Sequence, residues 1–380
     1  MPATAPAQPL SLPMTEFIID DGARYPAIWL RDNCPCADCA VPGSGQKLFG
    51  ITDLPWPDEL RIEDVDQNAH DGSVTVVFAP DGHTSRYERA WLEQHRPGLT
   101  PHAHDDRAED AKALWQAADF ANAVPEASWE SFAHDPAERA RCLEALLVKG
   151  FVLVHGVPVR DRAVLDVAEV FGFVRVTNYG DLFEVRVEEN PSNLAFSALP
   201  ITPHTDNPYR DPVPTIQLLH CLTNAAEGGD SGLVDGFHAA ARLRTEQSDA
   251  FEILTRTPVT FRYADTEADL AATNPLIGLD AVGRIKQIRF NNRSMRPVAL
   301  PPDEIAAFYR AYRAFAELLY DPAAQLNFRL EPGDCVIFDN TRTLHARTGF
   351  TASGHRHLQG CYADLDSAAS ALNVLRRGLA

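Results

Sequence analysis

Short stretches in which apolar residues alternate with polar ones, or run continuously, follow one another from residue 151 onward. Turn residues separate eight of them, which cover residues 151–157, 181–189, 214–222, 231–237, 259–264, 284–292, 326–340 and 355–364. Alternation with a period of two is typical of strands, and many short strands with few helices favour a sandwich or a barrel. We therefore expect a mainly β domain with some helices.

Three stretches have the spacing of amphipathic helices. Residues 108–123 and 135–150 precede the first strand, and the second of these starts with Asp135 and Pro136, which suit a helix N-terminus, and ends at Gly150. The third, residues 301–320, repeats apolar side chains at helical spacing after two prolines. It is the one strong helical pattern beyond residue 150.

A separate small β-rich unit is expected before the helices. Residues 17–30 and 73–87 both read as hairpins around Asp-Gly turns, whereas residues 96–110 are rich in Pro, His and Asp and lack periodicity. These patterns predict an N-terminal domain over residues 14–97 and a larger domain over residues 108–380, which suits a chain of 380 residues.

Composition narrows the classes of partner. The formal net charge of −19 opposes binding to nucleic acid or to anionic bilayers. No apolar run approaches the length that spans a membrane, and the first residues lack the features of a signal peptide, so we expect a cytoplasmic protein. Seven cysteines, three of them closely spaced, indicate a reducing compartment with one metal site.

The clearest chemical signal is a pair of histidines with one carboxylate. His204 and Asp206 stand two residues apart at the end of an extended segment, and His345 follows far downstream. This set fits the facial triad that binds Fe(II) and leaves positions open for 2-oxoglutarate and O2. A lone His-x-Asp is more often a surface turn. Arg356, eleven residues after His345, strengthens the prediction because its guanidinium can pair with a carboxylate of 2-oxoglutarate.

A second metal site is expected in the N-terminal domain. Cys34, Cys36 and Cys39 offer three thiolates, and His83 in the second hairpin is our choice for the fourth ligand of a closed, structural Zn(II) site. The alternative is three reduced surface cysteines, which would be prone to oxidation.

Several motifs carry a family resemblance. The runs PHTDNPYRDPVPTIQLLHCL, EGGDSGLVDGF, EPGDCVIFDNTRTLHAR and GHRHLQGCYADLD resemble the taurine dioxygenase-like superfamily, and most closely its γ-butyrobetaine dioxygenase branch, which also shares WLRDNCPC. The resemblance implies a double-stranded β-helix, or jelly roll, a small zinc domain, and a homodimer. It assigns His204, Asp206 and His345 to iron, Arg356 to 2-oxoglutarate, and Ser231 to the same co-substrate.

The resemblance also implies where a substrate binds. A trimethylammonium group would sit in an aromatic cage, and a carboxylate or phosphonate would face polar residues. The cage residues are Tyr179, Phe183, Phe196 and Tyr362. The residues for the anionic head group are Asn193, Asn291, Asn292 and Arg293.

Three positions depart from the family pattern. Phe183 and Phe196 stand where the animal enzymes carry Trp and Tyr, and Asn207 stands where they carry an aromatic residue, so one wall of the cage is expected to be missing. Arg293 replaces a small residue and would suit a dianionic phosphonate, unless it points to solvent. Each aromatic residue is, taken alone, as well explained by core packing.

We expect a dioxygenase that hydroxylates an unactivated carbon of a small quaternary-ammonium zwitterion, either γ-butyrobetaine or 2-(trimethylammonio)ethylphosphonate. One alternative is a related oxygenase acting on a sulfonate or on a trimethyllysine-like substrate. Another is a non-catalytic, zinc-containing binding module, although such a scaffold has no need of His204, Asp206, His345 and Arg356.

Overall fold

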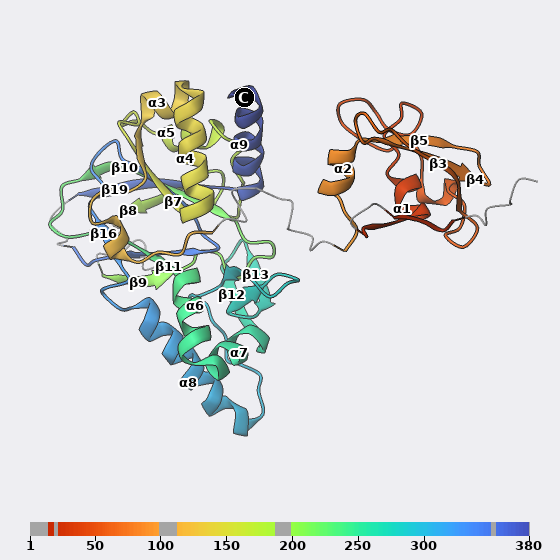
Figure 1. The fold of residues 1–380 in the computed structure, drawn as a ribbon. Coiled ribbons are helices and arrows are strands. Elements are labelled where there is room, and N and C mark those ends of the chain that lie inside the picture. The colour runs from red at the N-terminus through yellow and green to blue at the C-terminus, as the bar shows by residue number, and fades with distance from the viewer. Residues whose placement is uncertain (1–13, 19–21, 99–111, 187–198, 351–354, 380) are drawn as a thin grey trace, which may run out of the picture. The chain divides into compact units, whose positions relative to one another are not determined.

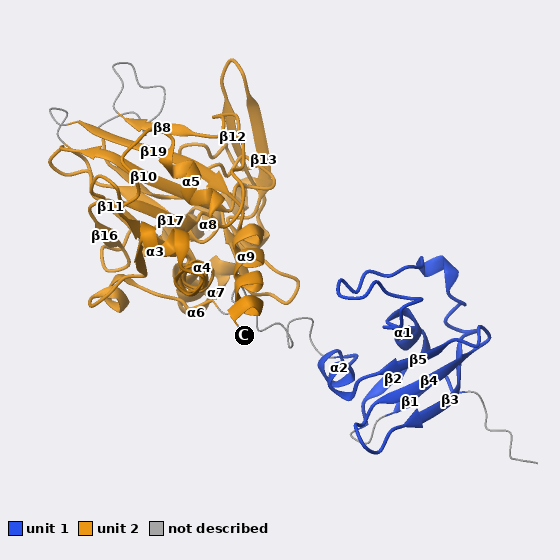
Figure 2. Ribbon diagram, turned by 90° about the horizontal axis from the view of Figure 1, so that it is seen from above, with its two compact units in different colours: residues 1–106 blue, residues 107–380 orange. Residues whose placement is uncertain are grey.

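The computed structural model describes residues 14–18, 22–98, 112–186, 199–350 and 355–379. The chain divides into two compact units, Met1–Asp106 and Arg107–Ala380 (Figure 2). Within the described residues no helix has both the length and the apolar character needed to cross a bilayer. Each unit is considered by itself below.

The N-terminal unit is built on small antiparallel sheets. Strands β3 (Arg61–Gln67), β4 (Val74–Ala79) and β5 (Thr84–Tyr87) form one sheet, and β1 (Glu16–Ile18) pairs with β2 (Arg24–Pro26). Helices α1 (Ala27–Asp32) and α2 (Arg89–Gln94) pack on them. Two buried tyrosines join helices to the sheets, because Tyr25 donates its hydroxyl hydrogen to Leu92 O at 2.9 Å and Tyr87 to Leu30 O at 2.6 Å.

Eight strands of the larger unit form two facing four-stranded layers. One layer contains β17 (Cys335–Asp339), β10 (Ile216–Asn224), β19 (Arg356–Ala363) and β8 (Phe183–Arg186), extended by β7 (Phe151–His155) and β6 (Glu126–Ser128). The other has the order β16 (Leu326–Phe328), β11 (Ser231–Asp235), β18 (Thr343–Arg347) and β9 (Ile201–His204). The chain passes between the layers in the manner of a double-stranded β-helix, which confirms the predicted fold class.

Helices cover the outside of both layers (Figure 1). Helices α4 (Pro136–Lys149), α5 (Ala163–Glu169) and α9 (Leu365–Leu379) pack on the larger sheet, together with α3 (Trp129–His134). On the side of the smaller sheet lie α6 (Gly236–Glu246), α7 (Ser248–Arg256) and α8 (Pro302–Leu319). Two hairpins adjoin them, β12 (Val259–Ala264) with β13 (Asp269–Asn274), and β14 (Ile277–Leu279) with β15 (Ile285–Ile288).

Helix α4 has the limits that its sequence predicts. The Asp135 carboxylate accepts hydrogen bonds from the backbone N–H groups of Ala137 and Glu138, and Gly150 ends the helix with φ +89°. A Cβ at Gly150 would also lie 2.7 Å from Oγ1 of Thr343 in β18. Glycine is therefore required by both the backbone conformation and the close approach of a strand that carries His345.

A buried ion pair ties the smaller sheet to its surroundings. Arg342 and Asp235 have fully buried side chains and form two hydrogen bonds, of 3.0 and 2.8 Å. Arg342 also donates to the carbonyl groups of Ala113 and Val148, at 2.5 and 2.7 Å. Asp235 accepts from the backbone N–H groups of Trp115 and Phe237, each at 3.0 Å. This pair thus connects β11, the turn before β18 and the segment that precedes α3.

Three expectations about local structure are wrong. Residues 112–116 are not helical, and only a short 3-10 turn, Ala117–Phe120, follows them, because Trp115 is held in the core by hydrogen bonds to Asp235 and to Lys149 O. The hairpin predicted over residues 17–30 ends at Pro26, where α1 begins. Helices α5, α6, α7 and α9 were not expected beyond residue 150.

Candidate active site

Two strands of the smaller sheet bring two histidines together. His204 ends β9 and lies directly opposite His345 of β18 in the strand pairing, so both imidazoles leave the sheet on one face. Their ring centroids are 4.1 Å apart. The register of one strand pair thus joins two residues that are far apart in sequence.

Asp206 completes this group just beyond the end of β9. Its Oδ1 lies 3.4 Å from Nε2 of His204, and its Oδ2 lies 3.7 Å from Nε2 of His345. One possible ligand atom from each of the three residues lies within 4.8 Å of the others, so the group could hold a single metal ion. The structure therefore brings together the three residues that the sequence analysis selected.

Hydrogen bonds fix both the backbone and the carboxylate of Asp206. The side chain of Asn340 accepts from the Asp206 N–H at 2.8 Å and donates to the carbonyl groups of Asp206 and Pro214, each at 3.0 Å. Gln217 Nε2 donates to Oδ2 of Asp206 at 3.0 Å, and the Tyr362 hydroxyl donates to the same oxygen at 3.4 Å. The carboxylate is thus held in one orientation before any ligand binds.

The protonation states suit a divalent metal. Burial, together with the neighbouring His204, lowers the pKa of His345 to about 3, so this imidazole is neutral near pH 7. Burial would raise the pKa of Asp206, but His345 and His204 outweigh that effect and lower it, so the carboxylate is ionised. Neutral imidazole and ionised carboxylate are the forms that bind metal, and two imidazoles with one carboxylate fit Fe(II).

Arg356 offers a buried positive charge to the same region. It begins β19, is 6% exposed, and its Nε has no hydrogen-bond partner within the described segments. Burial lowers its pKa to about 10, so it remains charged near pH 7. Burying a guanidinium is unfavourable unless it is well paired, and an anionic ligand would supply such a pair. Ser231, the other residue predicted to contact 2-oxoglutarate, lines the same cavity.

A second guanidinium, that of Arg347, was not predicted. Arg347 is 7% exposed and lines the cavity, and burial lowers its pKa to about 10. Arg347 and Arg356 both lie against Phe350, with their guanidinium carbons 4.9 and 5.7 Å from its ring centroid. The signal was present in the sequence, because in a strand the residue two positions after His345 projects to the same side.

The cavity above these residues has a volume of about 660 Å³ and a pronounced aromatic wall. Three of the predicted cage residues line it, Tyr179, Phe183 and Tyr362, and the rings of Phe183 and Tyr362 are 5.0 Å apart. Tyr209 and Tyr263 also line it and were missed, although Tyr209 follows Asp206 by only three residues. Their rings stack at 5.3 Å, and the hydroxyl groups of Tyr179 and Tyr209 are 2.8 Å apart.

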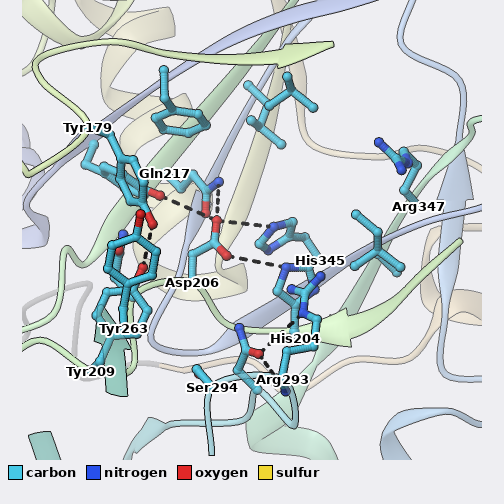
Figure 3. Close-up of a pocket in the computed structure, with 18 of the residues that line it drawn as sticks. Tyr179, His204, Asp206, Tyr209, Gln217, Tyr263, Arg293, Ser294, His345 and Arg347 are labelled. Carbon is cyan, nitrogen blue, oxygen red and sulfur yellow. Dashed lines mark hydrogen bonds and ion pairs between the residues drawn. The ribbon is translucent and has the colours of Figure 1, made fainter. Parts of the chain in front are cut away.

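Three tyrosines and Arg347 lie in different parts of the cavity, which Arg262, Arg293 and Arg296 also line. Figure 3 shows Tyr179, Tyr209 and Tyr263 on the Asp206 side of the two histidines, with Arg347 on the opposite side. The tyrosines thus offer a surface that suits a cation, and Arg347, on the other side of the histidines, offers one that suits an anion.

The residues predicted for an anionic head group have different positions. Asn291 and Arg293 line the cavity, and Asn291 Oδ1 accepts from the backbone N–H of Arg293 at 3.2 Å. Asn292 is exposed, is not among the lining residues, and accepts a hydrogen bond from the Tyr312 hydroxyl at 3.1 Å. Asn193 and Phe196 lie outside the described residues.

The N-terminal unit contains the second candidate metal centre. The Sγ atoms of Cys34, Cys36 and Cys39 lie 3.1, 3.7 and 3.5 Å from Nε2 of His83, and the four ligand atoms lie within 4.8 Å of one another. Burial lowers the pKa of His83, with a contribution from Arg31, so the ring is neutral as a metal ligand must be. Three thiols and one imidazole are a donor set typical of structural zinc.

Comparison with known proteins finds a family match for each of the two units. Residues 110–362 match the family model "Taurine catabolism dioxygenase TauD, TfdA family", and residues 16–93 match "Gamma-butyrobetaine hydroxylase-like, N-terminal". The chain is 36% identical to a gamma-butyrobetaine dioxygenase of Pseudomonas sp. (strain AK-1) over 92% of this chain and 90% of that protein.

Two other relatives are similar over comparable lengths. The trimethyllysine dioxygenase of Meyerozyma guilliermondii is 31% identical, covering 94% of this chain and 91% of that protein. The human gamma-butyrobetaine dioxygenase is 29% identical, and the match covers 94% of this chain and 92% of that protein. The chain belongs to the TauD/TfdA family of Fe(II)- and 2-oxoglutarate-dependent dioxygenases, in the branch that carries a gamma-butyrobetaine hydroxylase-like N-terminal domain.

Proposed function

We propose that the protein hydroxylates an unactivated C–H bond of a small trimethylammonium zwitterion, either γ-butyrobetaine or 2-(trimethylammonio)ethylphosphonate. Substrate, O2 and 2-oxoglutarate give the hydroxylated product, succinate and CO2, so one oxygen atom enters the substrate and the other enters succinate. Bound Fe(II) supplies the activation of O2.

The observation that carries this proposal is a cavity with three tyrosines on one side of the two histidines and Arg347 on the other. Ring faces stabilise a quaternary ammonium ion, which cannot donate a hydrogen bond, and Tyr179, Phe183 and Tyr362 offer such faces. Guanidinium groups instead bind carboxylates and phosphonates. A zwitterion and the dianion 2-oxoglutarate together match this distribution.

Each part of the site has a proposed task. His204, Asp206 and His345 hold iron, and Arg356 with Ser231 holds the distal carboxylate of 2-oxoglutarate. The aromatic residues, with Phe196, hold the ammonium group so that one C–H bond faces the iron. The remaining residues, Asn193, Asn291, Asn292 and Arg293, are proposed for the anionic head group, and Asn292 would have to turn away from Tyr312.

The test measures succinate release that depends on iron and O2, with each candidate substrate added in turn. Stimulation by one of them supports the proposal, and the His345→Ala variant should show none. Arg293→Ala then separates the head groups, because loss of a guanidinium should harm binding of a phosphonate more than that of a carboxylate. If neither compound stimulates turnover by the wild-type enzyme, the proposal is wrong.

A trimethyllysine-like substrate is the second candidate, and the 31% identity to a trimethyllysine dioxygenase favours including it. Its amino-acid end carries an ammonium group as well as a carboxylate, and Arg293 would repel the former. A sulfonate would leave the aromatic wall without a cation. A non-catalytic binding module would release no succinate with any compound, so the same assay separates all of these possibilities.

We also propose a cytoplasmic homodimer with one structural Zn(II) per chain. Light scattering on the purified protein should give twice the chain mass of 41.8 kDa. Fractionation of cells that express the protein should recover it with cytoplasmic markers.

A further inference from the structure

Asn207, the residue directly after Asp206, has an unusual environment. Its side chain lines the active-site cavity, yet the residue is only 2% exposed. Neither Oδ1 nor Nδ2 has a hydrogen-bond partner within the described segments. Among the described residues, Asn207 is the one residue whose side-chain amide has both polar atoms buried and without a hydrogen-bond partner.

Backbone conformation accounts for part of this choice of residue. Asn207 has φ +55°, in the left-handed region that asparagine tolerates better than most residues and glycine tolerates best. Glycine would therefore satisfy the turn without burying an amide. An unsatisfied buried polar group is unfavourable, so the amide itself requires an explanation beyond the turn.

The amide lies at the aromatic end of the cavity. It neighbours the phenol of Tyr362, whose ring packs against Phe183 and whose hydroxyl group bonds to Asp206. The two groups form no hydrogen bond of acceptable geometry. The Asn207 side chain is therefore close to the surface to which we assign the cation.

We propose that Asn207 is a specificity-determining residue whose amide oxygen accepts a hydrogen bond from an ammonium N–H, so that the site takes protonated dimethylammonium zwitterions as well as quaternary ones. This inference rests on the proposed function. A trimethylammonium group has no N–H and would leave the amide buried and unsatisfied. A dimethylammonium group has one N–H and would satisfy the amide, at the loss of one methyl contact with the aromatic wall.

The experiment compares kcat/KM for the trimethylammonium substrate and for its dimethylammonium analogue, 4-(dimethylamino)butanoate or 2-(dimethylamino)ethylphosphonate. The measured quantity is the ratio of the two values, dimethyl over trimethyl, in the wild type and in two variants. Asn207→Gly removes the amide and keeps the backbone conformation. Asn207→Leu removes the amide and keeps the number and branching of the side-chain heavy atoms, with a slightly larger volume.

The ratio should fall about tenfold in both variants, which corresponds to about 1.4 kcal/mol. Damage to iron binding or folding would lower both kcat/KM values together and leave the ratio unchanged. The matched control is Arg162→Gly, which removes a side chain at another residue with positive φ, φ +65°, at the start of α5. This control should leave the ratio at the wild-type value.

Two results would overturn the inference alone. An unchanged ratio in both variants would mean that the amide does not contact the cation, and a fall in Asn207→Gly but not in Asn207→Leu would mean that added space is responsible. If neither the trimethyl nor the dimethyl compound is turned over by the wild type, the proposed function fails and the inference fails with it.

Discussion

The buried pair of Arg342 and Asp235 offers a direct test of how the active-site scaffold is stabilised. Asp235→Asn keeps the size of the side chain but removes its charge, and it turns an N–H₂ group toward donors on Arg342, Trp115 and Phe237. The guanidinium would then be buried without a counter-ion, because the side chain of Arg342 is 0% exposed.

The expected loss is large. Removing one partner of a buried ion pair destabilises a protein by about 3–5 kcal/mol. For a unit of this size each kcal/mol lowers the melting temperature by roughly 2–4 °C, so the transition of the larger unit should move down by about 6–20 °C. Calorimetry on the intact chain can follow that transition.

Two controls make the test specific. Glu317→Gln breaks an exposed pair with Arg313, whose side chains are 65% and 82% exposed, and it should shift the same transition by no more than about 2 °C, because exposed pairs contribute little. The double variant Asp235→Leu/Arg342→Met should be more stable than the sum of the two single changes predicts, by about 1 kcal/mol or more. A melting temperature for Asp235→Asn within the range of the Glu317→Gln control would refute this account.

Three further predictions concern the metal centre, a pH dependence and co-substrate binding. Metal analysis of the wild type should find one zinc per chain, which Cys36→Ser should lose and Cys142→Ala, a change at a buried cysteine of the other unit, should retain. Equal zinc content in both variants would contradict the assignment. Burial would lower the pKa of His155, but its interactions with Asp334 at 2.7 Å and Glu126 at 3.3 Å outweigh that effect and raise it, so the protonated form stabilises the folded chain. This contribution to stability is present in full below the pKa of the unfolded state, about 6.5, and is lost as the pH rises through the higher pKa of the folded state. The difference in melting temperature between wild type and His155→Gln should therefore shrink over that pH range. A difference that grows with pH would show that the sign is wrong. Arg356→Lys should raise the KM for 2-oxoglutarate about tenfold or more, because an ammonium group cannot form the bidentate pair. Arg313→Lys, on the exposed face of α8, should leave this KM unchanged. An unchanged KM in Arg356→Lys would contradict the proposed role of the Arg356 guanidinium.

Local rules predicted the elements whose signals are contained in a few residues. The cap at Asp135 and the stop at Gly150 set α4, and alternating residues marked strands such as β10 and β19. The same rules failed for residues 112–116, where burial of Trp115 outweighs helix propensity. They also failed for α9, whose apolar face contacts α4, about 230 residues earlier in the chain.

The same contrast between local signals and long-range contacts decided which residues of the candidate site could be predicted. His204, Asp206 and His345 were selected because a downstream histidine and Arg356 accompany the His-x-Asp pair, and the structure brings the three residues together. Tyr263 and Gln217 were missed because nothing nearby in the sequence distinguishes a strand residue that faces the cavity from one that packs in the core. Asn292 matched a motif, yet its side chain bonds to Tyr312 of α8, a long-range contact that no local pattern encodes.

Strand β9 is the outermost member of its sheet, and in the described part of the chain two residue pairs, with an irregularity between them, connect it to β18. One of those pairs is His204 with His345. An iron ion bound by both residues would therefore link β9 to β18, where the strand pairing is short. A ligand that binds only when β9 and β18 are paired reduces the fraction of molecules in which β9 has separated from β18. Tighter binding reduces this fraction further. Iron starvation should therefore speed amide exchange and proteolytic cleavage near residues 199–206, which would tie the lifetime of the protein in the cell to its metal supply.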